Sequence, residues 1–219
     1  MKNFQTVTII SCLILTVGCG QKNENKSSAA EQSKAVSEKV AKNNTPQKPT
    51  ASPNRPPGST PAPDFTLATT TGELVSMSDL KGKVILLNFW GTWCGPCRME
   101  LPDFIKLHNK YNKDGLEIVG ITIRRGESIE DVAKFQEQWG LNYLLLNDIN
   151  GNEVSEVTMA YSRAIGLMIN GIPTTLIIDR EGFIVNGFVG PRREQVFFNA
   201  IEPYLWYKLT DPSHICRLT

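Results

Sequence analysis

The chain has 219 residues with 41% hydrophobic side chains, which is enough to bury one sizeable core and favours a single folded domain. Residues 63–219 carry fifteen Lys and Arg against nineteen Asp and Glu, a net charge of −4 that argues against a nucleic-acid partner. With two His residues and no second closely spaced pair of Cys, the composition also argues against a structural zinc site.

The first 18 residues have the pattern of an export signal. Lys2 precedes an apolar stretch from Val7 to Val17, which is too short to span a membrane as a helix. The string LTVG directly before Cys19 resembles a bacterial lipobox, in which the cysteine becomes the lipidated first residue of the mature protein. Thr16 stands where an aliphatic residue is commoner, and an ordinary signal peptide cut nearby is the alternative. We predict a lipoprotein-type signal peptide at 1–18 and lipidation of Cys19.

Residues 19–62 form a polar run rich in Lys, Ser, Asn, Gln, Ala and Pro, a composition that cannot bury a core. We predict a flexible tether that holds an extracytoplasmic domain to a membrane through the lipid. The segment carries seven basic residues and three Glu, a net charge of +4. This charge fits a solvated spacer, and attraction to an anionic lipid surface is the alternative.

Residues 63–206 alternate between strand-like and helix-like segments. The predicted elements are a hairpin over 64–80 with its turn at Thr71 and Gly72, a strand at 83–90, a helix at 94–111, a strand at 116–123, a helix at 128–140, a short strand at 142–148, a weaker helix at 153–165, two strands over 173–190, and a closing helix at 192–206. This order predicts an α/β fold with a central mixed β-sheet, helices on both faces and an N-terminal β-hairpin extension.

Cys94 and Cys97 directly follow the strand at 83–90, the position where active groups gather in open α/β sheets. Unpaired backbone N–H groups and the positive end of the helix dipole are expected to stabilise a thiolate at Cys94. Cys97 lies one helical turn further, where it can displace a substrate held on Cys94 as a mixed disulfide. Gly95 lets another chain approach, and Pro96 starts a helix without losing a bonded N–H. The pattern predicts a reversible dithiol–disulfide couple.

Three other interpretations of the cysteine pair explain the sequence less well. A structural disulfide across so short a loop constrains the unfolded chain little. A zinc or copper site needs three or four ligands, and the chain offers only His108 and His214 beside the pair. A one-cysteine peroxidase would carry the spacing PxxxTxxC, whereas Leu87 and Gly91 stand at the first two of those positions. We therefore expect neither a metal nor a cofactor.

The strings APDFTL, LKGKVILLNFWGTWCGPCRMELP, GLEIVGI and GIPTTLIIDREG resemble the TlpA/ResA family of membrane-tethered, extracytoplasmic thiol-disulfide oxidoreductases. The resemblance extends from residue 62 to residue 205, and the combination of WCGPC with GIPTT is its most specific part. It implies a thioredoxin-like fold for residues 63–206.

The resemblance also implies roles for residues around the pair. Pro173 follows Ile172 where the family has a cis-proline loop, which would expose the backbone of Ile172 to an extended substrate segment. A trans proline that only starts a strand is the alternative. Glu100 matches a glutamate that ResA-like proteins use near the site, where it would accept a proton from Cys97, and an exposed helix acid is the alternative. Trp93 is expected to form part of the docking surface.

The Gly-Pro spacer is of the thioredoxin type, which accompanies reduction potentials of roughly −270 mV, against about −120 mV for a strong oxidant. We predict a reductant of protein disulfides that is recharged by an integral membrane thiol transporter. The resemblance implies the CxxCH segment of apocytochrome c as a client. Alternatives are a disulfide oxidase, an isomerase, and a non-catalytic module that binds peptides beside Ile172 and Pro173. An isomerase usually relies on a dimer, whereas no dimerisation segment is evident, so a monomer is expected.

One thiol has no assigned role. Cys12 should leave with the signal peptide and Cys19 should carry lipid, so Cys216 is an odd cysteine in the predicted C-terminal tail at 207–219. A buried single thiol, an intermolecular partner and an incidental tail residue are the open interpretations.

Overall fold

The computed structural model describes residues 54–206. Its strands are β1 (Thr60–Pro61), β2 (Thr66–Thr69), β3 (Leu74–Ser76), β4 (Val84–Trp90), β5 (Leu116–Thr122), β6 (Leu144–Asn147), β7 (Thr174–Ile178) and β8 (Phe183–Val189). Its helices are η1 (Met77–Leu80), α2 (Gly95–Tyr111), η2 (Asn112–Asp114), α3 (Ile129–Trp139), α4 (Glu153–Ile165) and α5 (Glu194–Leu205). The predicted elements are all present, and β1 is an additional short strand.

The strands of the described residues form one mixed sheet in the order β1-β8-β7-β4-β5-β6-β2-β3. β4 is parallel to β5 and antiparallel to β7, and β5 is parallel to β6. The β2–β3 hairpin adds to the sheet beyond β6 through an antiparallel pairing of β2. This arrangement confirms the predicted mixed sheet with an N-terminal hairpin.

The position of β4 and β5 in the middle of the sheet explains why their sequences are almost continuously apolar. Every residue of β4 and of β5 is buried, because strands flank them on both sides and helices cover both faces of the sheet. Asn88 is the polar residue in the middle of β4, and it also lies in the interior. A buried amide needs hydrogen-bond partners, which the site described below supplies.

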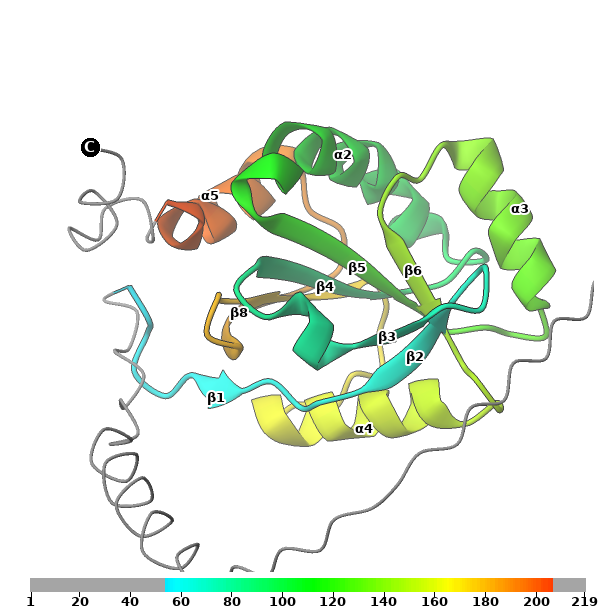
Figure 1. Cartoon of the computed structure of the whole chain (residues 1–219), viewed down its shortest axis with the longest axis horizontal. Helices are drawn as coiled ribbons and strands as arrows, with labels where there is room; N and C mark the ends of the chain where they lie inside the picture. Colours follow the sequence, from blue (N-terminus) through cyan, green and yellow to red (C-terminus); the bar gives the residue numbers. More distant parts are fainter. Residues whose placement is uncertain (1–53, 207–219) are drawn as a thin grey trace, which may run out of the picture. The chain divides into compact units, whose positions relative to one another are not determined.

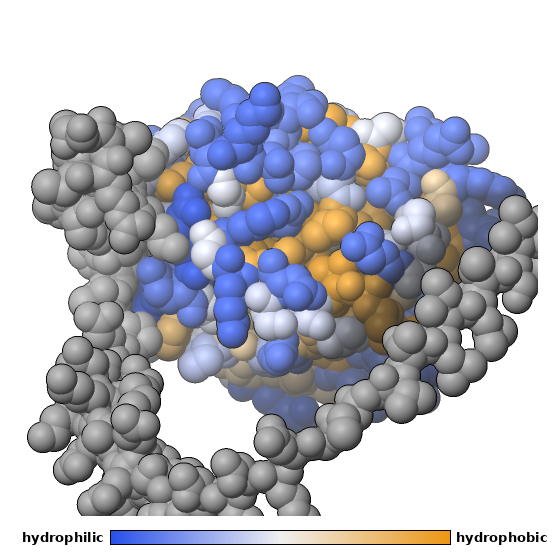
Figure 2. Space-filling model, viewed as in Figure 1, coloured by the Kyte–Doolittle hydropathy of each residue, from blue (hydrophilic) through white to orange (hydrophobic). Residues whose placement is uncertain are grey.

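Helices cover the two faces of the sheet separately (Figure 1). On one face α2, α3 and α5 pack in a core that includes Leu86, Phe104 and Phe197. On the other face α4 and η1 pack in a second core, around Phe89 and Tyr161. Figure 2 shows apolar side chains in the middle of one face of the domain, with hydrophilic side chains around and among them. Burial of each large apolar side chain in these cores contributes roughly 1.5–3 kcal/mol.

The ends of α3 follow from local sequence. Ser128 Oγ accepts a hydrogen bond from the backbone N–H of Asp131 at 3.1 Å, and the Asp131 carboxylate accepts one from the backbone N–H of Ser128 at 3.0 Å. This reciprocal pair satisfies two N–H groups that the first turn leaves unbonded. Gly140 ends the helix with a φ of 62°, a left-handed conformation that glycine adopts without strain.

Residues 54–62, predicted as the end of the tether, pack against the folded domain. The guanidinium carbon of Arg55 lies 3.7 Å from the ring centroid of Phe183, and Arg55 Nε forms an ion pair with Asp179 Oδ2 at 2.7 Å. β1 then pairs with β8. The partners are more than 100 residues away in sequence, so the local composition, which is rich in Pro, does not reveal them. Most of the predicted tether, the signal peptide, Cys19, Cys216 and the tail at 207–219 lie outside the described residues.

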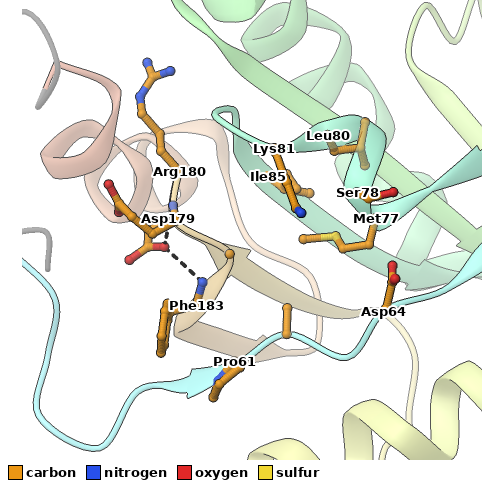
Figure 3. A pocket seen from close by; sticks show the side chains of 13 residues that line it. Pro61, Asp64, Met77, Ser78, Leu80, Lys81, Ile85, Asp179, Arg180 and Phe183 are labelled. Atoms are coloured by element: carbon orange, nitrogen blue, oxygen red, sulfur yellow. Dashed lines mark hydrogen bonds between the residues drawn. The ribbon is translucent and has the colours of Figure 1, made fainter. Parts of the chain in front are cut away.

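A cavity of about 480 Å³ lies at the end of the central strands that is opposite the cysteines. Pro61, Met77, Lys81 and Phe183 are among its lining residues (Figure 3). Ile85, near the start of β4, also lines it, whereas the cysteines come after the end of the same strand. The part of β4 from Ile85 to Trp90 spans about 16 Å, at about 3.3 Å per residue. The cavity is therefore separate from the thiol chemistry.

Arg180, on the rim of this cavity, links the end of α5 to the segments that precede β4 and β5. Its side chain extends away from the cavity (Figure 3). The guanidinium donates hydrogen bonds to the carbonyls of Tyr204 and Leu205 at the end of α5, at 3.1 and 2.7 Å. It also donates to the carbonyls of Gly82 and Asp114, both at 2.7 Å, in the segments before β4 and β5. These carbonyls lie at or beyond the ends of regular elements, and one side chain satisfies them.

We expect Arg180→Met to lower the free energy of unfolding by about 2 kcal/mol, because partly buried carbonyls lose a charged donor. Urea denaturation followed by circular dichroism measures the change. Arg163→Met, at an exposed position on α4, is the matched control and should change stability by less than about 0.5 kcal/mol. Equal losses of stability in the two variants would contradict the role of Arg180 as a link between α5 and the segments before β4 and β5.

Candidate active site

Cys94 and Cys97 form a disulfide at the amino end of α2, with their Cα atoms 5.2 Å apart. Cys94 is the residue that caps the helix, one position before its first residue, and its Sγ accepts a hydrogen bond from the backbone N–H of Cys97 at 3.2 Å. Cys94 is 4% exposed and Cys97 is 0% exposed, so an incoming sulfur meets Cys94 first. Once the disulfide is reduced, the N–H group and the helix dipole favour negative charge on the Cys94 sulfur.

The loop before β7 lies directly against the disulfide. The peptide bond between Ile172 and Pro173 is cis, as predicted. The carbonyl oxygen of Ile172 lies 3.6 Å from Cys94 Sγ. The carbonyl of Pro173 accepts a hydrogen bond from the backbone N–H of Gly190 at 2.8 Å, which ties the loop to the end of β8. The structure thus brings GIPTT and WCGPC together and places a backbone edge beside the accessible sulfur.

Glu100 lies one helical turn beyond Cys97 and is buried, with 1% of its surface exposed. Its Oε1 accepts a hydrogen bond from Asn88 Nδ2 at 2.9 Å, and its Oε2 accepts one from the backbone N–H of Arg192 at 3.3 Å. Removal of the carboxyl from water raises the pKa of Glu100 to about 7, although these hydrogen bonds lower it. The alternative of an exposed helix acid is therefore wrong. A carboxyl with this pKa exchanges a proton near neutral pH.

Asn88 belongs to the site, although no motif marks it. Its Nδ2 also donates to Thr175 Oγ1 at 2.9 Å, so the amide links β4, α2 and β7. The signal that identifies Asn88 in the sequence is one amide in an otherwise apolar buried strand, since such a group has to be paired. Arg192, whose backbone N–H reaches Glu100, lies in a loop with no comparable signal.

Trp93 is held by the loop between β5 and α3. Its Nε1 donates to the carbonyl of Ile123 at 3.0 Å, and the guanidinium carbon of Arg125 lies 3.7 Å from its ring centroid. Glu127 in the same loop accepts hydrogen bonds from Thr92 Oγ1 and from the backbone N–H of Arg125. The ring is half-buried, so part of it remains available as a docking surface beside Cys94.

Gly95 and Pro96 complete the surface around the accessible sulfur. Both are exposed at the start of α2. No heavy atom of the described residues lies within 4 Å of a Cβ added at Gly95, so the space above this residue is open to another chain. The predicted residues therefore converge on one edge of the sheet, and together they can form and break a disulfide with an extended peptide.

Comparison with known proteins identifies the family. The sequence model described as the AhpC/TSA family matches residues 59–186. The chain belongs to this family. Thiol-disulfide oxidoreductase ResA of Bacillus subtilis (strain 168) is 35% identical over 145 residues, which cover 65% of this chain and 74% of the relative. Thioredoxin-like protein YneN of the same organism is 39% identical over 130 residues, which cover 59% of this chain and 69% of the relative.

A solved structure agrees with the sequence relatives. The thiol:disulfide interchange protein of the thioredoxin family from Chlorobium tepidum TLS matches with a TM-score of 0.59 and 33% identity, over 67% of this chain and 97% of that one. The resemblance to ResA and the thioredoxin-like fold are confirmed. With its paired cysteines at the predicted place, the protein is a thiol-disulfide oxidoreductase.

Residues 54–206 offer neither a metal cluster nor a membrane-spanning helix. No group of three or more His, Cys, Asp or Glu side chains in this range is arranged to hold a metal ion. None of the helices in the range has the length and apolar character needed to cross a membrane.

Proposed function

We propose that the oxidoreductase reduces disulfides of client proteins outside the cytoplasm. The Cys94 thiolate attacks one sulfur of the client disulfide, which forms a mixed disulfide and releases the other client sulfur as a thiolate. The Cys97 thiolate then attacks the Cys94 sulfur, so the mixed disulfide breaks and the client leaves as a dithiol. Two electrons pass from the cysteine pair to the client. The observation that carries this proposal is the Cys94 sulfur at the helix start, 3.6 Å from the Ile172 carbonyl.

Within this cycle, Glu100 accepts the proton of Cys97. The reaction needs Cys97 as a thiolate, yet Cys97 is buried, and burial disfavours a charged sulfur. A carboxyl one helical turn away with a pKa of about 7 can take that proton at neutral pH. Asn88 positions this carboxyl through its amide. Trp93, Gly95, Pro96 and the backbone of Ile172 and Pro173 form the surface that binds the client.

The setting of the reaction is part of the same proposal. Residues 1–18 direct export, Cys19 carries a lipid anchor, and a membrane thiol transporter supplies electrons to the monomeric domain. The CxxCH segment of apocytochrome c is the proposed client, on the basis of the resemblance to the TlpA/ResA family. Such a segment presents two cysteines in an extended chain, which fits the backbone edge at Ile172.

The direction of electron flow is tested by titrating the Cys94/Cys97 couple in redox buffers of known potential. We expect a midpoint of roughly −270 mV, the value that accompanies a thioredoxin-type spacer. Thiol content at each potential is measured by alkylation and mass spectrometry. A midpoint close to about −120 mV would instead identify an oxidase.

A further inference from the structure

Arg125 places a positive charge on the side chain of Trp93, the residue before the reactive Cys94. Its guanidinium carbon lies 3.7 Å from the ring centroid of Trp93, and Trp93 is the residue before Cys94. Stacking on an aromatic face stabilises a guanidinium and fixes its plane. Arg125 is an exposed residue, so this charge meets solvent and an approaching client.

The surrounding loop holds Arg125 in that position. The Trp93 ring is anchored to the carbonyl of Ile123, and the backbone N–H of Arg125 donates to Glu127. The same Glu127 carboxylate accepts the hydroxyl hydrogen bond of Thr92. The carboxylate of Glu127, the one closest in sequence to Arg125, is therefore engaged by the Thr92 hydroxyl and a backbone N–H, and not by the Arg125 guanidinium.

The guanidinium groups of Arg124 and Arg192 are engaged in the fold, whereas Arg125 is exposed to solvent. Arg124 donates to Asp148 at 3.4 Å and to the carbonyl of Glu127 at 3.1 Å. The guanidinium of Arg192 donates to the carbonyls of Gly190 and Pro191. Within residues 54–206 the guanidinium of Arg125 makes no hydrogen bond and no ion pair, so the N–H groups at its edge remain available. A stacked guanidinium offers these groups in the fork geometry that fits a carboxylate.

We propose that Arg125 is a recognition residue that favours client disulfides flanked by Asp or Glu. This inference rests on the proposed function and names the class of client that the site prefers. A client bound along Ile172, with its sulfur on Cys94, passes beside Trp93 and Arg125. A carboxylate on the flanking residues would pair with the guanidinium, and a Lys or Arg there would be repelled. Arg98 and Arg193, exposed at the starts of α2 and α5, add positive charge to the same edge.

The test compares disulfide-bonded peptides that are identical except for Glu, Gln or Lys beside the reactive cysteine. We expect the reduced wild-type protein to reduce the Glu peptide about fivefold faster than the Lys peptide at low salt, in second-order rate constant. Arg125→Gln should remove most of the preference, and Arg125→Glu should invert it. High salt should weaken the preference of the wild type, because screening acts on solvent-exposed charges.

Two controls separate recognition from chemistry. Lys113→Glu makes the same charge change at an exposed position in η2, before β5 and so at the other edge of the sheet, and should keep the wild-type preference. Hydroxyethyl disulfide, which is small and neutral, measures the intrinsic reactivity of each variant, and the peptide preference is taken as the ratio of the Glu and Lys rates within one protein. An unchanged peptide preference in both Arg125 variants would overturn the inference while leaving the reductase proposal intact. Failure of the wild type to reduce any disulfide would overturn the reductase proposal itself.

Discussion

Replacing Cys94 with Ser should lower the rate of client reduction by at least about 10³-fold, because a hydroxyl is not ionised at neutral pH and cannot replace the attacking thiolate. Cys97→Ser should behave differently. It keeps the first attack but loses the sulfur that releases the client, so the mixed disulfide on Cys94 accumulates. Mixing each reduced variant with a disulfide peptide, followed by acid quenching and mass spectrometry, distinguishes the two outcomes.

Both variants replace sulfur with a smaller atom at a buried site, so their folding has to be checked. Far-UV circular dichroism and urea denaturation of reduced wild type, Cys94→Ser and Cys97→Ser provide this control. The assignment of the two roles depends on which variant traps the peptide. Trapping by Cys94→Ser, with no adduct on Cys97→Ser, would reverse the proposed order of attack.

Glu100 should make the stability of the oxidised protein depend on pH. Its pKa is about 7 in the folded state against 4.5 for an ordinary glutamate, so the folded state binds the proton more tightly than the unfolded chain. Stability due to this group is fully present below about pH 4.5 and is lost as the pH rises to about 7. The loss amounts to about 3 kcal/mol, at 1.36 kcal/mol for each pKa unit. In Glu100→Gln this loss is absent.

The measurement is the free energy of unfolding of wild type and Glu100→Gln at several values between pH 4.5 and 8. Contributions from other groups cancel in the difference between the two proteins. That difference should shift by about 3 kcal/mol in favour of Glu100→Gln as the pH rises. Glu73→Gln, at an exposed position in the hairpin turn, makes the same chemical change away from the site and is the matched control. A constant difference for Glu100→Gln would show that the carboxyl has an ordinary pKa.

The same variant tests the proton transfer in the proposed cycle. If Glu100 accepts the proton of Cys97, the pH profile of client release from the mixed disulfide should change in Glu100→Gln. The initial attack by Cys94 should keep its profile, because that step does not use Glu100. An unaltered profile for release would remove Glu100 from the mechanism and leave it a purely structural role.

The sequence by itself determined the order of the elements and the position of the reactive pair. The apolar runs of β4 and β5 identify strands buried on both faces, and Ser128 and Gly140 mark the ends of α3 through local hydrogen bonds and backbone conformation. The place of Cys94 and Cys97 follows from the same logic, since they come between a buried strand and a helix. These features depend on neighbouring residues and on periodicity, which a sequence displays directly.

The tertiary structure alone decided the properties that depend on distant partners. Helical spacing puts Glu100 near Cys97. Its burial, which raises its pKa, comes from packing against Asn88 of β4 and Arg192 in the loop before α5. The docking of residues 54–62 and the stacking of Arg125 on Trp93 likewise join segments that lie far apart in the chain. Solvation and electrostatic environment are set by which groups surround a side chain, and only the folded arrangement supplies that information.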